Sequence, residues 1–171
     1  MKKTFLIIAS FLFITSTVFS QYKVNVNSLK EYGGKAFKVD DDKPYTGKVF
    51  GLDKSTGKKS LQGQYKNGLK NGKWTEWHSN GQKKNERTFK DGKKDGLWTR
   101  WRKNGQKGEE GAYKDGKKDG LWTLWYENGQ KKLEDTYKYG ELISSKCWDK
   151  DGNECECSEK YYGCKSFLDN N

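Results

Sequence analysis

The sequence is poor in the residues that build most globular cores and most catalytic sites. It contains one histidine, one proline and one methionine, and from residue 21 onward only 19 of 151 residues are Leu, Ile, Val or Phe. Together with a formal net charge of +11, such a composition ordinarily indicates disorder. No Ser/His/Asp or Cys/His constellation is present. We therefore expect neither an enzyme nor a cofactor.

Aromatic residues and glycines take the place of the missing aliphatic residues. All seven Trp, all ten Tyr and all 20 Gly lie beyond residue 20. Regularly spaced aromatic side chains can bury enough apolar area for a chain to fold. The sequence therefore predicts a folded protein with a thin, aromatic core.

Residues 1–20, MKKTFLIIASFLFITSTVFS, have the pattern of an export signal. Two lysines precede an apolar run from Phe5 to Thr15, and small or polar residues follow up to Ser20, so we expect cleavage before Gln21. Ser10 interrupts the run, whereas a membrane-spanning helix needs ~18 unbroken apolar residues. The sequence predicts an exported protein, periplasmic or secreted to the cell surface, and export disfavours a nucleic acid partner.

A repeat of 24 residues dominates the remainder of the chain. Regular copies span 66–89, 90–113 and 114–137, and the segment KDGKKDGLWT occurs unchanged in the last two. Two glycines, two tryptophans, a threonine and an NGQK segment recur in all three copies: Gly68/92/116, Gly72/96/120, Trp74/98/122, Trp77/101/125, Thr75/99/123 and residues 80–83, 104–107 and 128–131.

Less regular copies flank these three. Upstream, Phe50 stands at the spacing of Trp74, and downstream Trp148 comes one residue early against Trp125. Atypical end copies are expected because a terminal repeat has a neighbour on one side only. We count about five units and divide the chain into a signal peptide (1–20), an N-terminal segment (21–44), hairpin repeats (45–146) and a Cys-containing terminal repeat with a cap (147–171).

Each unit reads as two short antiparallel strands. An NG pair between short runs of aromatic and polar residues is typical of a two-residue hairpin, whose type I′ turn needs positive φ at both central residues. We assign the KDGKKDG segment to the return turn. One unit cannot bury enough surface to fold alone, so neighbouring units must share strand pairing and ring contacts. The predicted fold is all-β, an elongated stack of antiparallel β-hairpin repeats.

The segment YKDGKKDGLWTLWYENGQKK carries a family resemblance. Its pattern Y-x-x-G-x-x-x-G-x-W-x-x-W-x-x-N-G-Q-x resembles the variant MORN repeat of the bacterial YwqK-type proteins, which are often labelled antitoxins, and the resemblance extends from Tyr45 to about Gly152. It implies stacked β-hairpins that bind proteins or membranes, and it carries over no catalytic residues. An export signal fits poorly with an antitoxin acting in the cytoplasm.

The two tryptophans of a unit predict two rows of rings. Trp74, Trp98 and Trp122 are most simply the core row. Three residues further on, Trp77, Trp101 and Trp125 point to the opposite face of a flat strand. If twist or a bulge does not bury them, these three rings form an open ladder suited to a partner's apolar ridge or to stacking on sugars.

Basic charge is concentrated in the N-terminal half. The net charge is +4 over 21–65, +4 over 66–89 and +3 over 90–113, but 0 over 114–137 and −2 over 138–171. A basic half can meet an anionic membrane, an anionic glycan or an acidic protein. Most of the lysines alternate with Asp or Gly in turns, so the alternative is a solvated face that keeps an exposed sheet soluble.

The four cysteines all lie in the tail and predict a small disulfide-linked cap. Export to an oxidising compartment favours disulfides. Of the three pairings, the one that joins Cys155 to Cys157 is disfavoured by its tight loop. The spacing C-x7-C-x-C-x6-C lacks the paired C-x2-C arms of zinc sites, so we expect no metal. The four candidates are Cys147, Cys155, Cys157 and Cys164.

These patterns favour an exported, non-enzymatic repeat scaffold that binds a partner protein. Two other hypotheses remain: a cell-wall glycan binder that uses the ladder of Trp77, Trp101 and Trp125, and a protein that associates with anionic membranes through its basic half. An unpaired terminal strand also allows a homodimer formed edge to edge.

Overall fold

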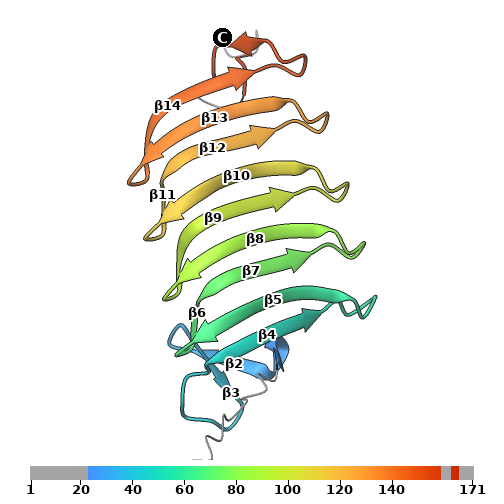
Figure 1. Cartoon of the computed structure of the whole chain (residues 1–171), viewed down its shortest axis with the longest axis vertical. Helices are drawn as coiled ribbons and strands as arrows, with labels where there is room; N and C mark the ends of the chain where they lie inside the picture. Colours follow the sequence, from blue (N-terminus) through green and yellow to red (C-terminus); the bar gives the residue numbers. More distant parts are fainter. Residues whose placement is uncertain (1–22, 159–162, 166–171) are drawn as a thin grey trace, which may run out of the picture.

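The computed structural model describes residues 23–158 and 163–165, so the predicted signal peptide lies outside the described residues. The described part is almost entirely β-structure (Figure 1). A single 3₁₀ turn, η1, spans Val26–Ser28. The strands are β1 (Val24–Asn25), β2 (Leu29–Tyr32), β3 (Lys35–Lys38), β4 (Gly47–Leu52), β5 (Lys59–Lys66), β6 (Leu69–Lys70), β7 (Gly72–Trp77), β8 (Lys83–Lys90), β9 (Lys93–Trp101), β10 (Lys107–Lys114), β11 (Lys117–Lys118), β12 (Gly120–Trp125), β13 (Lys131–Lys138), β14 (Glu141–Trp148) and β15 (Glu154–Cys155).

One antiparallel meander runs the length of the molecule. Its strand order is β1-β4-β5-β7-β8-β9-β10-β12-β13-β14-β15, with the short β6 and β11 paired to β5 and β10. Among the strands of the described residues, only β1 runs parallel to its neighbour, β4. The hairpin β2–β3 forms a separate sheet. The prediction of an elongated stack of β-hairpins is confirmed, with hairpins β4–β5, β7–β8, β9–β10, β12–β13 and β14–β15 side by side (Figure 1).

The prediction of type I′ turns at the NG pairs is wrong, because the two-residue type I′ turns lie in the KDGKKDG segments instead. At the NG turns only Gly81, Gly105 and Gly129 have positive φ, and His78 N donates to Gln82 O while Gly81 N donates to His78 O. That is a three-residue loop with glycine in the left-handed position, not a type I′ turn. The type I′ turns lie at Asp91–Gly92 and its equivalents, where both residues have positive φ. In the copy that begins at Lys90, Lys90 itself lies in β8 and residues 93–96 lie in β9.

The core lies on one face of the sheet because glycines let the Trp rings lie across the neighbouring strand. A Cβ on Gly63 would lie 2.3 Å from the Trp74 ring, and one on Gly111 would lie 2.2 Å from the Trp122 ring. Trp74 is 5% exposed and Trp122 is 1% exposed. We call the face that bears Trp74, Trp98 and Trp122 the core face, and the opposite one, which bears Trp77, Trp101 and Trp125, the outer face.

Edge-to-face ring contacts connect the hairpins along the core face. Tyr65 and Trp74 have ring centroids 5.0 Å apart, and Tyr113 and Trp122 have the same separation. Each buried indole also donates from Nε1 to a backbone carbonyl, Trp74 to Gln64 at 3.1 Å and Trp122 to Ala112 at 3.0 Å. The indoles thereby satisfy their one polar atom within the core.

The central hairpin departs from this scheme because Arg87 occupies the position of Gly63 and Gly111. The Arg87 guanidinium lies 4.7 Å from the Trp98 ring centroid, the β8–β9 register shifts between Arg87 and Phe89, and Trp98 is only half-buried. Trp98 Nε1 is buried without a hydrogen-bond partner. The arginine side chain fills the space that a glycine leaves empty. The Trp98 ring therefore cannot lie against the neighbouring strand.

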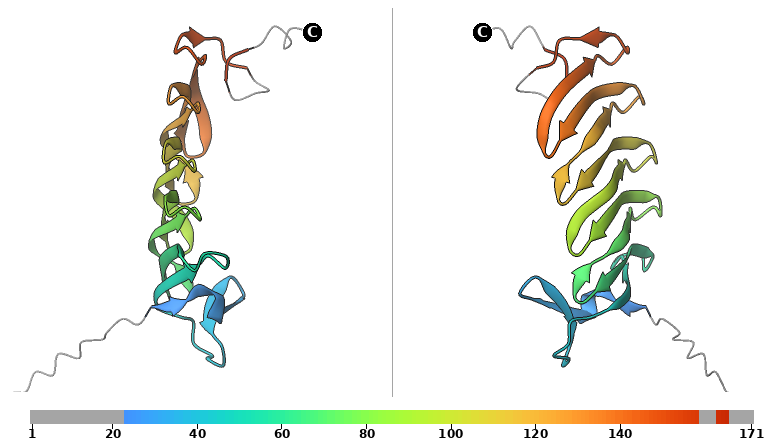
Figure 2. Two further views of the ribbon diagram at one scale, coloured as in Figure 1. Left: turned by 90° about the vertical axis from the view of Figure 1, so that its right-hand side faces the viewer. Right: turned by 60° about the vertical axis from the view of Figure 1, so that its left-hand side comes forward.

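The first and last described segments add structure on the core face, and the middle is a single layer (Figure 2). At the N-terminal end Val24, Val26 and Leu29 pack against the buried cluster of Tyr45, Val49 and Trp74. Val49, which pairs with Gly63, takes the place that spacing assigned to Phe50. At the C-terminal end the disulfides Cys147–Cys157 and Cys155–Cys164 hold the last segment. Within the described residues, no helix is long and apolar enough to cross a membrane.

Candidate interaction face

The tryptophans predicted as a binding ladder lie at the ends of β7, β9 and β12, on the outer face. The bulge in each hairpin falls in the returning strand: Glu76 pairs with Asn85 and Trp77 with Lys83, which leaves Lys84 as the extra residue. Since β7 itself keeps its alternation, Trp77 stays on the face opposite Trp74. Trp77, Trp101 and Trp125 are all half-buried, so the ladder is neither open nor fully covered.

A lysine of the preceding strand covers each of these rings. The Nζ atoms of Lys59, Lys83 and Lys107 lie 4.2, 5.3 and 6.0 Å from the ring centroids of Trp77, Trp101 and Trp125 respectively. Trp148 continues the row, with Lys131 Nζ at 5.5 Å. These are cation–π distances, and the ammonium groups sit where a sugar ring would have to stack.

Most of the covering lysines are also paired with a glutamate three residues further along the strand. The N–O distances are 2.8 Å for Lys83–Glu86, 2.7 Å for Lys107–Glu110 and 2.6 Å for Lys131–Glu134. Burial raises the pKa of Glu86, but hydrogen bonds from Lys83 and Lys73 outweigh that effect, so its pKa is lowered overall. Three of the four lysines that cover these rings therefore have a carboxylate partner that offsets their charge.

Small and aliphatic side chains complete the outer face. Thr75, Thr99 and Thr123 are buried beside the glutamates, and Thr99 Oγ1 donates to Glu110 Oε2 at 3.2 Å. Leu97 and Leu121 lie at equivalent positions of β9 and β12 and are 51% and 55% exposed. Both belong to the face opposite the core, since Leu97 and Leu121 each adjoin a core-face tryptophan in sequence. On this face the exposed leucines lie four residues before the half-buried tryptophans of the same strands, with a buried threonine between them. We call this recurring set of leucines, threonines and tryptophans, together with its Lys–Glu pairs, the strip.

Sequence reasoning missed the residue that follows the second tryptophan. The three copies carry different side chains at this position, so spacing alone assigns it no role. The Nε2 of His78 lies 3.1 Å from the carbonyl oxygen of Trp101, a contact that needs the proton on Nε2. The guanidinium of Arg102 donates to the carbonyl of Trp125, and Tyr126 OH donates to that of Trp148 at 2.9 Å. The three side chains differ, yet each donates a hydrogen bond to the next hairpin. The presence of a hydrogen-bond donor at this position in every copy was the sequence signal that could have identified this contact.

On the core face, three further lysines place their ammonium groups over aromatic rings. Lys70, Lys94 and Lys118 Nζ lie 4.8, 4.3 and 4.2 Å from the ring centroids of Trp74, Trp98 and Trp122. Burial, together with the nearby Arg87, lowers the pKa of Lys94. Their aliphatic stems cover a core that has no second layer above it.

Two features limit the chemistry of the described residues. They contain no group of three or more His, Cys, Asp or Glu side chains placed to hold a metal ion. All four cysteines are in disulfides, which are typical of an oxidising, non-reducing environment. The recurring feature that remains is the strip on the outer face.

The fold and this face define a repeat protein built from stacked β-hairpins. A family model described as MORN repeat variant matches residues 70–91 and 118–139. Each matched segment runs from the strand before a first tryptophan to the turn that ends the unit. None of the curated proteins compared matches the chain.

Proposed function

We propose that the protein is an exported, non-enzymatic repeat scaffold whose outer face binds a partner protein. The observation that carries the proposal is the strip on that face, which combines Leu97 and Leu121, more than half exposed, with the half-buried rings of Trp101 and Trp125 four residues further along the same strands. The central hairpins form a single layer, and the first and last described segments pack on the opposite side (Figure 2). Exposed apolar side chains that recur in register are a usual mark of an interaction surface.

The chemistry of the strip supports a protein partner over a glycan or a membrane. Ammonium groups at 4.2–6.0 Å from the Trp ring centroids occupy the ring faces that a sugar would need. Ion pairs such as Lys107–Glu110 neutralise much of the positive charge that would attract anionic lipid. Exposed leucines interspersed with ion pairs and partly covered rings resemble the mixed apolar and polar surface of protein interfaces. Repeats of the matched family mediate protein or membrane interactions, and the resemblance to YwqK-type proteins agrees with a binding role.

Two variants and one control test the proposal. The chain from residue 21, with its disulfides intact, is immobilised and offered an envelope protein extract, isolated cell wall and anionic vesicles. We expect one protein to bind in stoichiometric amount at moderate salt. Replacing Leu97→Ser and Leu121→Ser together should abolish its capture, because both side chains contribute exposed apolar area. Val39→Ser, 46% exposed near β3, serves as the matched control.

The other outcomes separate the alternatives. Capture of the same proteins by wild type and by the double variant would contradict binding at the outer face. Retention only on cell wall would favour the glycan hypothesis, and retention only on anionic vesicles, weakened by salt, would favour the membrane hypothesis. A complex of two copies would point to the homodimer.

A further inference from the structure

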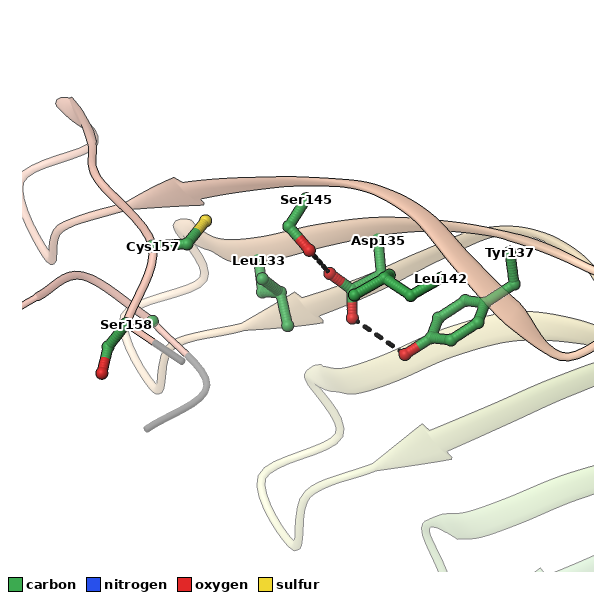
Figure 3. A pocket seen from close by; sticks show the side chains of 8 residues that line it. Leu133, Asp135, Tyr137, Leu142, Ser145, Cys157 and Ser158 are labelled. Carbon is green, nitrogen blue, oxygen red and sulfur yellow. Dashed lines mark hydrogen bonds between the residues drawn. The ribbon is translucent and has the colours of Figure 1, made fainter. Parts of the chain in front are cut away.

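The last hairpin lacks the tryptophan that the three regular hairpins place on the core face. In β9, Trp98 pairs with Arg87 of the preceding strand, but in β14 the residue that pairs with Asp135, the equivalent of Arg87, is Ser145. No indole fills the core face at this point. A cavity of about 410 Å³ lies there instead (Figure 3).

The cavity has mostly apolar walls and one acidic group. Residues that follow β15 close one side of the cavity, and the sheet supplies the remaining walls. The main lining residues are Leu133, Asp135, Tyr137, Leu142, Ser145 and Cys157. Leu133 is buried, whereas Leu142 is 54% exposed and marks the rim. Figure 3 shows the Asp135 carboxylate between the side chains of Ser145 and Tyr137.

Asp135 is an unusual residue for this position. It takes the place of Gly63 and Gly111 on the returning strand and is only 5% exposed. Its two oxygens accept from neutral hydroxyls, Oδ1 from Ser145 Oγ at 2.6 Å and Oδ2 from Tyr137 OH at 3.1 Å. Among the described residues no cation lies within ion-pair distance of it. A buried carboxylate with neutral donors alone is costly and retains unused acceptor capacity.

We propose that this pocket binds a basic side chain, arginine or lysine, of a partner protein. A guanidinium or ammonium group would reach Asp135, and its aliphatic stem would lie along Leu133 and Leu142. Lys118, on the same face, is held against the rings of Trp122 and Tyr137, with its Nζ at 4.2 and 4.6 Å from their centroids.

The distribution of charge along the chain agrees with this occupant. Residues 114–137 have no net charge and residues 138–171 carry −2, whereas the preceding segments from residue 21 are all positive. A basic partner is therefore attracted to the end of the molecule that holds the pocket and repelled from the other end. The pocket lies on the core face, so this proposal does not depend on the outer face.

Titration with model compounds tests the pocket directly. The probes are N-acetylarginine methylamide and its neutral isostere N-acetylcitrulline methylamide, added to the oxidised chain from residue 21 with the leucine methyl groups observed by NMR. We expect saturable shifts of Leu133 and Leu142 with the arginine probe and at least about tenfold weaker binding of the citrulline probe. Butylguanidine, which lacks the backbone, should bind more weakly than the arginine probe.

Two variants and a control complete the test. Asp135→Asn keeps the shape of the site and should weaken the arginine probe by about tenfold or more, whereas Asp151→Asn, which removes an exposed charge, should not. Leu142→Trp narrows the rim while leaving the carboxylate and its two hydrogen bonds, and it should reduce binding without unfolding the protein. Leu97→Ser with Leu121→Ser should leave this binding unchanged.

Three results would overturn the proposal. The first is equal affinity for the arginine and citrulline probes, and the second is unchanged binding of the arginine probe by Asp135→Asn. The third is the absence of shifts up to about 20 mM probe, a concentration high enough to detect binding even when the Kd is weaker than ~1 mM. Tighter binding of butylguanidine than of the arginine probe would assign the pocket to a free amine or guanidine and contradict a protein partner.

Discussion

At the scale of single residues, glycine decides where a tryptophan can be buried. Gly63 and Gly111 leave room for an indole to lie against the backbone, and Arg87 does not. The consequence is visible in exposure: Trp74 and Trp122 are buried, while Trp98 is half-buried and its Nε1 has no partner. Two copies of an identical segment thus give different packing because the neighbouring strand differs.

Gly111→Ala should destabilise the protein measurably. The added Cβ would lie 2.2 Å from the Trp122 ring, so the indole must move, and overpacking of this kind costs about 1–3 kcal/mol. Urea unfolding gives the free energy. Gly108→Ala in the same strand is the matched control, because its nearest neighbour would lie at 3.7 Å. Equal effects of the two substitutions would contradict the role assigned to Gly111.

Glu86 makes the outer face sensitive to acid. Its pKa in the folded protein is lowered from 4.5, so its contribution to stability is present above the unfolded value and is lost as pH falls through the folded value. Glu86→Gln removes this contribution. We expect the unfolding free energies of wild type and Glu86→Gln to converge as the pH falls from about 5 to about 2. A gap that stays constant over this range would argue against the Lys73–Glu86–Lys83 interaction.

At the scale of elements, the hairpins are joined by backbone pairing and by one side chain per turn. His78, Arg102 and Tyr126 each reach the backbone carbonyl at the end of the next hairpin's first strand. At the opposite edge, backbone bonds such as Gly92 N to Lys70 O, at 2.9 Å, join successive turns. Each hairpin is therefore fixed to the next at both ends of its strands.

Tyr126→Phe measures this connection with little other change. It removes only the hydroxyl that donates to Trp148 O at 2.9 Å, and we expect a loss of about 0.5–1.5 kcal/mol in the free energy of unfolding. Tyr139→Phe, whose side chain is 64% exposed, should change stability by less than about 0.5 kcal/mol. If the two substitutions have the same effect, the Tyr126 bond contributes nothing to the stack.

At the scale of the whole molecule, the protein is a linear array whose ends need protection. The N-terminal segment packs against Tyr45 and Val49, and β1 covers the edge of β4. At the other end β15 is only two residues long, and the disulfides Cys147–Cys157 and Cys155–Cys164 hold the final segment. Since each hairpin contacts mainly its neighbours, stability should vary along the array.

Loss of the terminal disulfide should therefore act locally. In Cys155→Ser with Cys164→Ser, the removed bridge spans nine residues, and closing so short a loop stabilises by about 2–3 kcal/mol. Hydrogen exchange should accelerate in β14 and β15 and remain unchanged in β7 and β8. Uniform acceleration along the sheet would show instead that the array unfolds as one cooperative unit.

The repeat allowed much of the fold to be predicted, and local geometry set the limit of that prediction. Strands, hairpins and the core row of Trp74 and Trp122 follow from spacing and composition. The turn types do not, because NG and DG pairs have similar propensities and the strand register decides which one closes a two-residue turn. The predicted ladder of Trp77, Trp101 and Trp125 is on the expected face, but sequence gave no sign that lysines from another strand would cover its rings.

The order of residues along the chain was enough to establish an all-β array of 24-residue units, because a repeated pattern of glycines and aromatics imposes the same local structure on each copy. It was also enough to place the cysteines together at one end. Only the tertiary structure decided which tryptophans are buried and which cysteines pair. It also placed Asp135 in a cavity beside Ser145. Those outcomes depend on the side chain that the adjacent strand brings opposite each residue, and a short-range pattern does not contain that information.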